Sequence, residues 1–104
     1  MNHKVVHNLD IAVVKTCVNK AFKSYSKKFA ANKPTMDWVA DYTAKISFVI
    51  GKDTINGKID ITSTSINMTL ESSSFLVNLF KKQALKIIDA EIQIWLNKAH
   101  SGEI

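Results

Sequence analysis

The chain contains no arginine, because all fourteen of its strongly basic residues are lysines. Arginine is the usual residue for gripping guanine or phosphate through two parallel hydrogen bonds, so its absence argues against sequence-specific reading of DNA. A single cysteine excludes a disulfide framework and a cysteine-rich zinc module. Three glycines and one proline exclude a low-complexity or collagen-like chain. No apolar run approaches the roughly 18 residues of a membrane span.

The N-terminus lacks the features of a secretion signal. The residues after Met1 lead only into a short apolar stretch, which His7, Asn8 and Asp10 interrupt. We therefore expect a cytoplasmic protein in which Cys17 is a reduced thiol. With 104 residues, the chain has the length of one domain spanning residues 1–104.

The net charge of +5 is unevenly distributed. Residues 1–35 hold seven lysines and one aspartate, whereas residues 36–104 hold seven lysines and eight acids. The excess is therefore concentrated in the first third of the chain. It is either an ordinary solvated helix face or a surface for acidic proteins, nucleic acid or anionic lipid. The candidate basic surface consists of Lys20, Lys23, Lys27 and Lys28.

A short strand over residues 4–8 is followed by the signals of a long helix. Asp10 is a good N-cap, because its carboxylate can accept hydrogen bonds from the first helical N–H groups. Apolar residues then recur at spacings of three and four as far as Phe29. The helix should end near residues 31–32, because Pro34 disfavours helical geometry at the residue before it.

The middle of the chain changes to a period of two. Apolar and polar residues alternate over residues 36–41, 44–50, 55–62 and 66–71, which predicts four strands with one apolar face each. Asn56-Gly57 favours a hairpin turn, but a turn there would mix the two faces. We therefore expect the turn at Lys52-Asp53, which places Phe48 opposite Gly57.

A second turn, at Ser63-Thr64, places Ile59 opposite Met68 and again keeps the apolar residues on one face. The expected fold is a two-layer α+β domain in the order β-α-β-β-β-β-α. Two long helices would cover one face of an antiparallel sheet formed by a four-strand meander and the short first strand. The residues expected to be largely buried are Phe22, Trp38, Ile46, Phe48, Ile59, Met68 and Phe80.

The second helix is expected from about residue 74 to 99, and its apolar surface is wider than one sheet contact requires. Two adjacent apolar lines run along it, and one of them contains Ile87 and Ile94. We expect the helix to touch the sheet and the first helix, or a second subunit. The candidate apolar surface for a protein partner or a homodimer consists of Leu85, Ile88, Ile92 and Trp95.

The residues that could carry chemistry do not form a recognisable catalytic set, so we expect no enzyme activity, no cofactor and no metal site. His3 and His7 lie about 13 Å apart on a strand, too far to chelate one ion. Cys17 is expected to be a buried structural thiol. Glu91 is either a carboxylate with a raised pKa in a cavity or a boundary residue that reaches water or Lys98; we favour the boundary position.

The order of these features resembles the polyhydroxyalkanoic acid system family of small bacterial proteins, which are named for polyester-granule loci. The resemblance covers nearly the whole chain and implies a cytoplasmic, granule-associated protein without assigned catalytic residues. It rests on His7-Asn8-Leu9-Asp10 before a lysine-rich helix, then on Trp38, Phe48, Gly57-Lys58-Ile59-Asp60-Ile61, Leu70, Phe80 and the final amphipathic helix.

Three functions remain open at this point. The first is a non-enzymatic cytoplasmic module that binds a protein or a hydrophobic granule surface. The second is a small carrier of lipid or another hydrophobic ligand, which would need a cavity of some hundreds of Å³. The third is non-specific nucleic-acid binding through the lysine face of the first helix.

Overall fold

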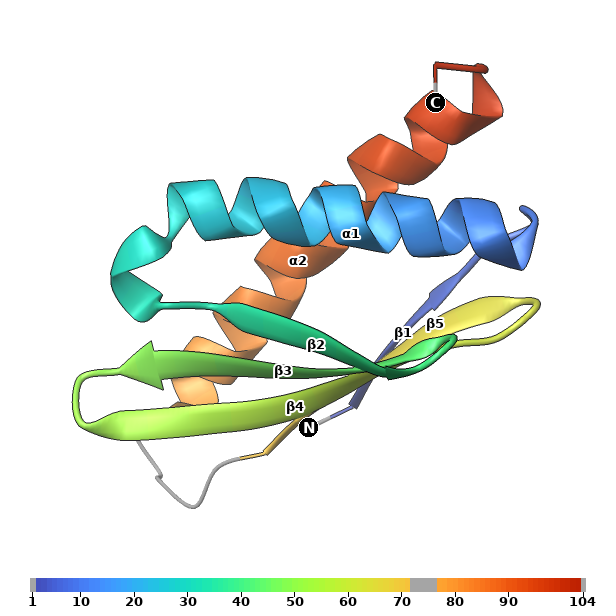
Figure 1. Cartoon of the computed structure of the whole chain (residues 1–104). Coiled ribbons are helices and arrows are strands. Elements are labelled where there is room, and N and C mark those ends of the chain that lie inside the picture. The colour runs from blue at the N-terminus through green and yellow to red at the C-terminus, as the bar shows by residue number, and fades with distance from the viewer. Residues whose placement is uncertain (1, 72–76, 104) are drawn as a thin grey trace.

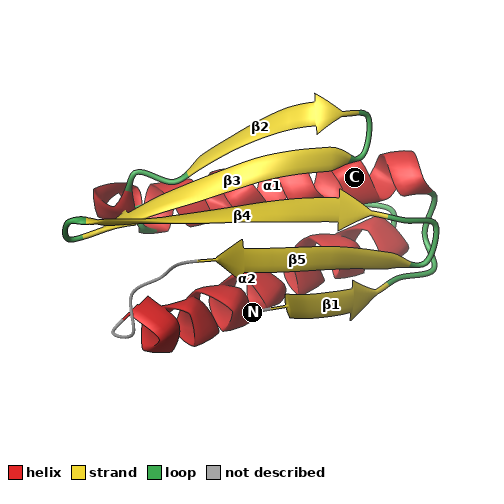
Figure 2. Cartoon of the chain, turned by 90° about the horizontal axis from the view of Figure 1, so that it is seen from below, coloured by secondary structure: helices red, strands yellow, loops and turns green. Residues whose placement is uncertain are grey.

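The computed structural model describes residues 2–71 and 77–103, with side chains from Lys81 onward in the last helix. It has the expected α+β architecture and element order. In Figure 1, both helices lie on the same side of the sheet, and Figure 2 shows the other face of the sheet uncovered. The elements are β1 (Asn2–Val6), α1 (Ile11–Lys28), a short 3-10 turn (Ala30–Asn32), β2 (Thr35–Ala40), β3 (Thr43–Ile50), β4 (Asp53–Ile61), β5 (Ser65–Glu71) and α2 (Val77–His100).

The five strands form one antiparallel sheet in the order β1-β5-β4-β3-β2. The first strand begins and ends two residues earlier than expected and pairs with β5 at the edge of the sheet. Strand alternation places a polar row on the uncovered face and an apolar row under the helices. The hairpin between β4 and β5 has the expected register, with Ile59 opposite Met68.

The register between β3 and β4 differs from the expected one by two residues. Phe48 lies opposite Ile55, and Ile46 lies opposite Gly57, so the expected pair of Phe48 and Gly57 is wrong. The reason is a tighter turn at Gly51-Lys52, where Gly51 adopts a φ of 60° that other residues rarely adopt. A shift of two residues leaves every side chain on its predicted face.

Helix α1 begins as expected, with the Asp10 carboxylate accepting a hydrogen bond from the Ala12 N–H at 2.8 Å. It ends at Lys28, about one turn earlier than expected, and the 3-10 turn then leads to Lys33 at a φ of 46°. Residues 72–76, which include the expected start of the second helix, lie outside the described residues.

The core lies between the sheet and the two helices, and four of the expected core residues are fully buried there: Ile46, Phe48, Ile59 and Met68. Trp38 and Phe22 are only half-buried, which corrects the expectation. Trp38 lies on the edge strand β2, where its indole N–H donates to the Asn19 side chain at 2.8 Å. The side chain of Phe80 lies outside the described residues.

Candidate functional site

The two layers of the protein differ in charge. The helices α1 and α2 carry nine of the fourteen lysines but only two of the nine acidic residues, a balance of +7, whereas the remainder of the chain carries five lysines and seven acids, a balance of −2. Both helical acids are paired: Asp89 with His3 of β1, and Glu91 with Lys28. Asp10 and Glu103 lie at the ends of these helices, so the helical layer as a whole carries +5 and the sheet with its connecting segments carries 0. The helical layer is therefore the cationic layer.

The four lysines of the expected basic surface have two different placements. Lys20, Lys23 and Lys27 are exposed along α1, as their spacing predicted. Lys28 turns towards α2 and forms an ion pair with the buried carboxylate of Glu91. Only the first three lysines are thus part of the outer basic strip.

Glu91 is therefore buried, and the lysine that it contacts is Lys28 of α1 and not Lys98. The carboxylate side chain is only 7% exposed and meets the Lys28 ammonium at the end of α1. A buried carboxylate with a cationic partner is a structural feature, because losing the partner would leave an uncompensated charge. The pair fastens the end of α1 to the middle of α2.

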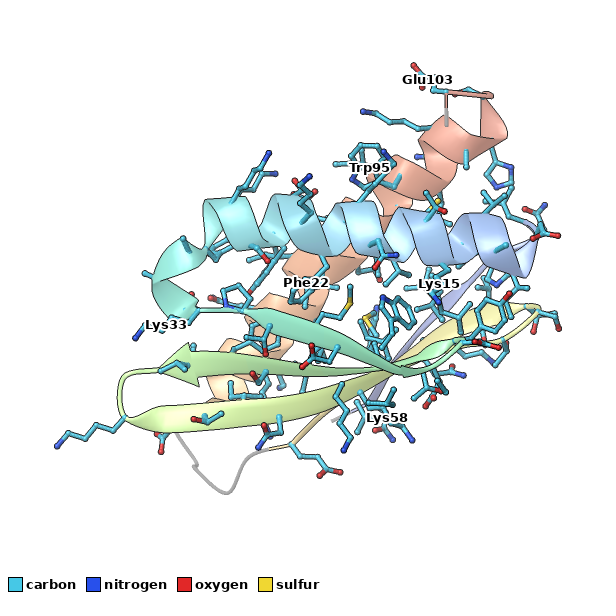
Figure 3. All side chains as sticks on the ribbon, viewed as in Figure 1. Lys15, Phe22, Lys33, Lys58, Trp95 and Glu103 are labelled. Carbon is cyan, nitrogen blue, oxygen red and sulfur yellow. The ribbon has the colours of Figure 1, made fainter. Side chains whose placement is uncertain are left out.

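Trp95 lies where the two helices cross. The ammonium of Lys98 lies 4.4 Å from the centre of the Trp95 ring, and that of Lys20 lies 5.2 Å from it. Figure 3 shows Trp95 on the side of α1 away from the sheet. Such distances are typical of cation–π contacts. The half-exposed indole is thus flanked by two lysines from different helices.

Two of the exposed large apolar side chains lie on the helices, whereas Val6 and Val39 lie on the edge strands β1 and β2. Ile94 is 47% exposed and Val13 is 37% exposed. Val13, Lys20 and Lys27 are spaced by seven residues, close to two helical turns, so they share one side of α1. We call this surface the Lys–Trp face; it consists of Val13, Lys20 and Lys27 of α1 and Ile94, Trp95 and Lys98 of α2.

The expected apolar partner surface is mostly inside the protein. Leu85, Ile88 and Ile92 are 5%, 5% and 1% exposed, so three of its four members belong to the core and only Trp95 reaches the outside. Two adjacent apolar lines run along this helix, and packing against α1 and the sheet buries the line that contains Leu85, Ile88 and Ile92. Ile94, on the other line, is exposed, although the sequence pattern did not single it out.

The space between the helices and the sheet is filled. The pocket found there encloses only about 10 Å³. A carrier of a lipid-sized ligand needs some hundreds of Å³, so the described core speaks against an internal ligand. The residues around this small void are Val18, Ala21, Phe22, Tyr25, Ile59, Ile88 and Ile92.

The larger hollows are open and lie on the surface. One of about 400 Å³ runs between β1 and α2 beside His3, Lys82 and Lys86. Another of about 580 Å³ lies on the uncovered sheet face beside Lys45 and Lys58. Within the described ranges, no three His, Cys, Asp or Glu side chains come together as metal ligands would.

The two N-terminal histidines have separate structural partners. The His3 ring contacts the Asp89 carboxylate, which ties the edge strand β1 to α2. The His7 ring meets the Thr62 carbonyl oxygen at 2.8 Å and accepts a hydrogen bond from the Leu9 N–H at 3.2 Å. Both side chains fix the ends of β1.

The Cys17 thiol is fully buried and donates to the Trp95 carbonyl oxygen at 3.6 Å. Burial raises the pKa of this thiol, although its backbone hydrogen bond and the Lys20 charge oppose the shift. Because the thiolate is the reactive form, we expect labelling of Cys17 by a disulfide reagent at pH 8 to be at least about 100-fold slower in the folded than in the denatured protein. Rapid stoichiometric labelling of the folded protein would contradict this placement.

Stability should fall at alkaline pH because two buried acids favour their neutral forms. Burial raises the pKa of Cys17 above 9.0 and that of Tyr25 above 10.0. In the unfolded chain both groups ionise at a lower pH than in the folded protein. Their contribution to the free energy of unfolding is therefore full at neutral pH and is lost as the pH rises through and above these values. Denaturant titrations at several pH values should therefore show a loss of unfolding free energy above pH 9. This loss should be smaller in Tyr25→Phe and in Cys17→Ala than in the wild type. An unchanged alkaline slope in both variants would contradict the assignment.

Neither a protein-family model nor a curated protein sequence matches the chain. In the described part of the chain, neither helix is long and apolar enough to cross a membrane.

Proposed function

We propose that this chain is a non-enzymatic binding module of the bacterial cytoplasm that attaches through the Lys–Trp face to an extended anionic and partly apolar surface. A polyester storage granule is the surface that the family resemblance implies. The observation that carries the proposal is the separation of charge, with +7 on the helices and −2 on the rest of the chain. Opposite charge on a partner strengthens and orients binding.

The exposed apolar residues favour a surface over the other candidates. Ile94 and Trp95 project among lysines, which suits an interface that is charged but also admits apolar groups. Nucleic acid would bind the lysines, but an exposed isoleucine would add less to its affinity. The uncovered sheet face also carries polar side chains, whereas stacking of bases requires aromatic ones. Internal carriage of a ligand is opposed by the filled core.

Two double variants with the same change in charge test the proposal. Lys20→Glu with Lys98→Glu alters the Lys–Trp face, whereas Lys45→Glu with Lys58→Glu alters the uncovered sheet face and is the matched control. Each variant is mixed with isolated polyhydroxyalkanoate granules, and bound protein is measured after sedimentation. We expect the first variant to lose at least about tenfold in affinity, as attraction turns into repulsion, while the control stays near wild type.

The proposal fails if the wild type remains in the supernatant, or if both double variants lose affinity equally. Circular dichroism and thermal melting of both variants separate loss of binding from loss of folding. Equal losses in two folded variants would mean that net charge, and not the Lys–Trp face, governs attachment.

A further inference from the structure

We propose that the Lys–Trp face recognises the surface of an anionic phospholipid layer, with Trp95 at the level of the headgroups and Ile94 inserted beside it. This inference rests on the proposed function and names the chemistry of the surface that the same face would contact. The ligand is a lipid surface, and the chain lies on that surface without entering it as a span.

The side chains around Trp95 suit the boundary between lipid and water. Its ring lies between the ammonium groups of Lys20 and Lys98, at 5.2 and 4.4 Å. An indole is favoured at a lipid–water boundary because it has an apolar body and a polar N–H. The two lysines hold positive charge at the same depth as the ring, where lipid phosphates would lie. The three side chains therefore complement a headgroup region, where the lysines would meet phosphates and the indole would lie between the polar and apolar parts of the lipid.

Ile94 and Val13 form the apolar part of the Lys–Trp face. Ile94 is next to Trp95 and 47% exposed, and Val13 on α1 is 37% exposed. Transferring such side chains from water to the boundary of the lipid acyl chains is favourable, because it removes apolar surface from water. Lysine stems also cover apolar surface while their ammonium groups stay in water. Contact with lipid therefore buries apolar surface of the Lys–Trp face, which contact with a purely polar polyanion would leave in water.

The charges around the Lys–Trp face favour an anionic surface. The carboxylate nearest to the face on α2, Glu91, is buried and neutralised by Lys28, so it does not repel anionic headgroups. Five acidic residues lie on the strands and hairpins, in the other layer of the protein, whereas Asp10 caps α1 and Glu103 follows α2 beyond Lys98 (Figure 3). Each lysine near an anionic membrane strengthens binding by about fivefold. Lys20, Lys27 and Lys98 together thus orient the chain with its sheet away from the lipid.

Three preparations test this inference: vesicles with about one-third phosphatidylglycerol in phosphatidylcholine, vesicles of phosphatidylcholine alone, and lipid-free polyester particles. We expect the wild type to sediment with the anionic vesicles and weakly with the neutral ones. The variant with Lys20→Glu and Lys98→Glu should lose about 25-fold or more in affinity for the anionic vesicles, because two fivefold contributions are removed. The matched control with Lys45→Glu and Lys58→Glu should stay within about threefold, since salt screens charges on the far face.

Two further variants report on the apolar contact. Ile94→Ser should weaken vesicle binding by about fivefold without unfolding the protein, since nearly half of the side chain is already exposed. With Trp38→Phe, the remaining indole is Trp95, and its fluorescence should shift to shorter wavelength when anionic vesicles are added. An unshifted emission maximum in a folded, vesicle-bound variant would overturn the placement of Trp95 at the headgroups.

The other outcomes are equally decisive. Binding to lipid-free polyester but not to anionic vesicles would overturn this inference and leave granule attachment, but not its electrostatic basis, intact, whereas binding to neither would defeat both. Equal binding to neutral and anionic vesicles would overturn the role of the lysines. Tighter binding to a DNA duplex than to vesicles, with the same dependence on Lys20 and Lys98, would show that the face serves nucleic acid.

Discussion

Phe48→Ala is expected to lower the free energy of unfolding by about 3–5 kcal/mol. The Phe48 side chain is 0% exposed and lies at the centre of the core. Its ring meets Tyr25 edge-on, with 5.5 Å between centroids, and lies 6.5 Å from the ring of Phe22. Truncation would remove these contacts and leave a cavity under α1. Urea titration monitored by circular dichroism measures the change.

Phe48→Leu is the companion variant, because it keeps an apolar side chain of similar reach and should cost clearly less than alanine. A loss below about 1 kcal/mol for Phe48→Ala would mean that the apolar face of β3 had been assigned to the wrong side of the sheet. The result therefore tests the orientation of the whole sheet as well as one contact.

Gly57→Ala should destabilise the protein by about 1–3 kcal/mol, the usual range for overpacking. A Cβ at this position would lie 2.5 Å from both the Thr69 carbonyl oxygen and the Leu70 Cδ2 atom, and 3.0 Å from Ile46 Cγ1. A leucine tip can move, but the carbonyl belongs to the ladder between β4 and β5. The adjacent change Asn56→Ala is the control, because that side chain is exposed.

Thermal melting of Gly57→Ala and Asn56→Ala against wild type checks this expectation. A wild-type midpoint for Gly57→Ala would show that β4 and β5 are farther apart at this residue than described. The glycine is thus required by the close approach of the Thr69 carbonyl and the Leu70 side chain of β5, and not by the pairing with Phe48 that was expected from the sequence.

The sequence predicted the faces of the strands better than their pairing. Period-two alternation places Phe48 and Ile59 on the apolar face whatever the partner strand does. Two registers that differ by two residues bury the same side chains, so alternation does not discriminate between them. The backbone freedom of Gly51 selects the tighter turn, and that preference depends on turn geometry that the pattern of apolar residues does not contain.

The candidate site was predictable only in part. The spacing of Lys20, Lys23 and Lys27 on one helix was sufficient to predict an exposed basic strip. Trp95 joins that strip because α2 crosses α1 at this point, and a crossing is a tertiary contact that neither helix encodes alone. The same crossing buries Ile92 and exposes Ile94, whereas the sequence had favoured Ile92 as the exposed residue of two similar apolar lines.

Lysine footprinting of granule-bound protein identifies the layer that meets the granule, because the fourteen lysines are distributed over both layers. Free and granule-bound protein are acylated briefly, and the modification of each lysine is compared by mass spectrometry. We expect strong protection of Lys20, Lys27 and Lys98 and unchanged modification of Lys45 and Lys58. Protection of Lys45 and Lys58, with Lys20 and Lys98 still fully reactive, would show that the sheet, and not the Lys–Trp face, meets the granule.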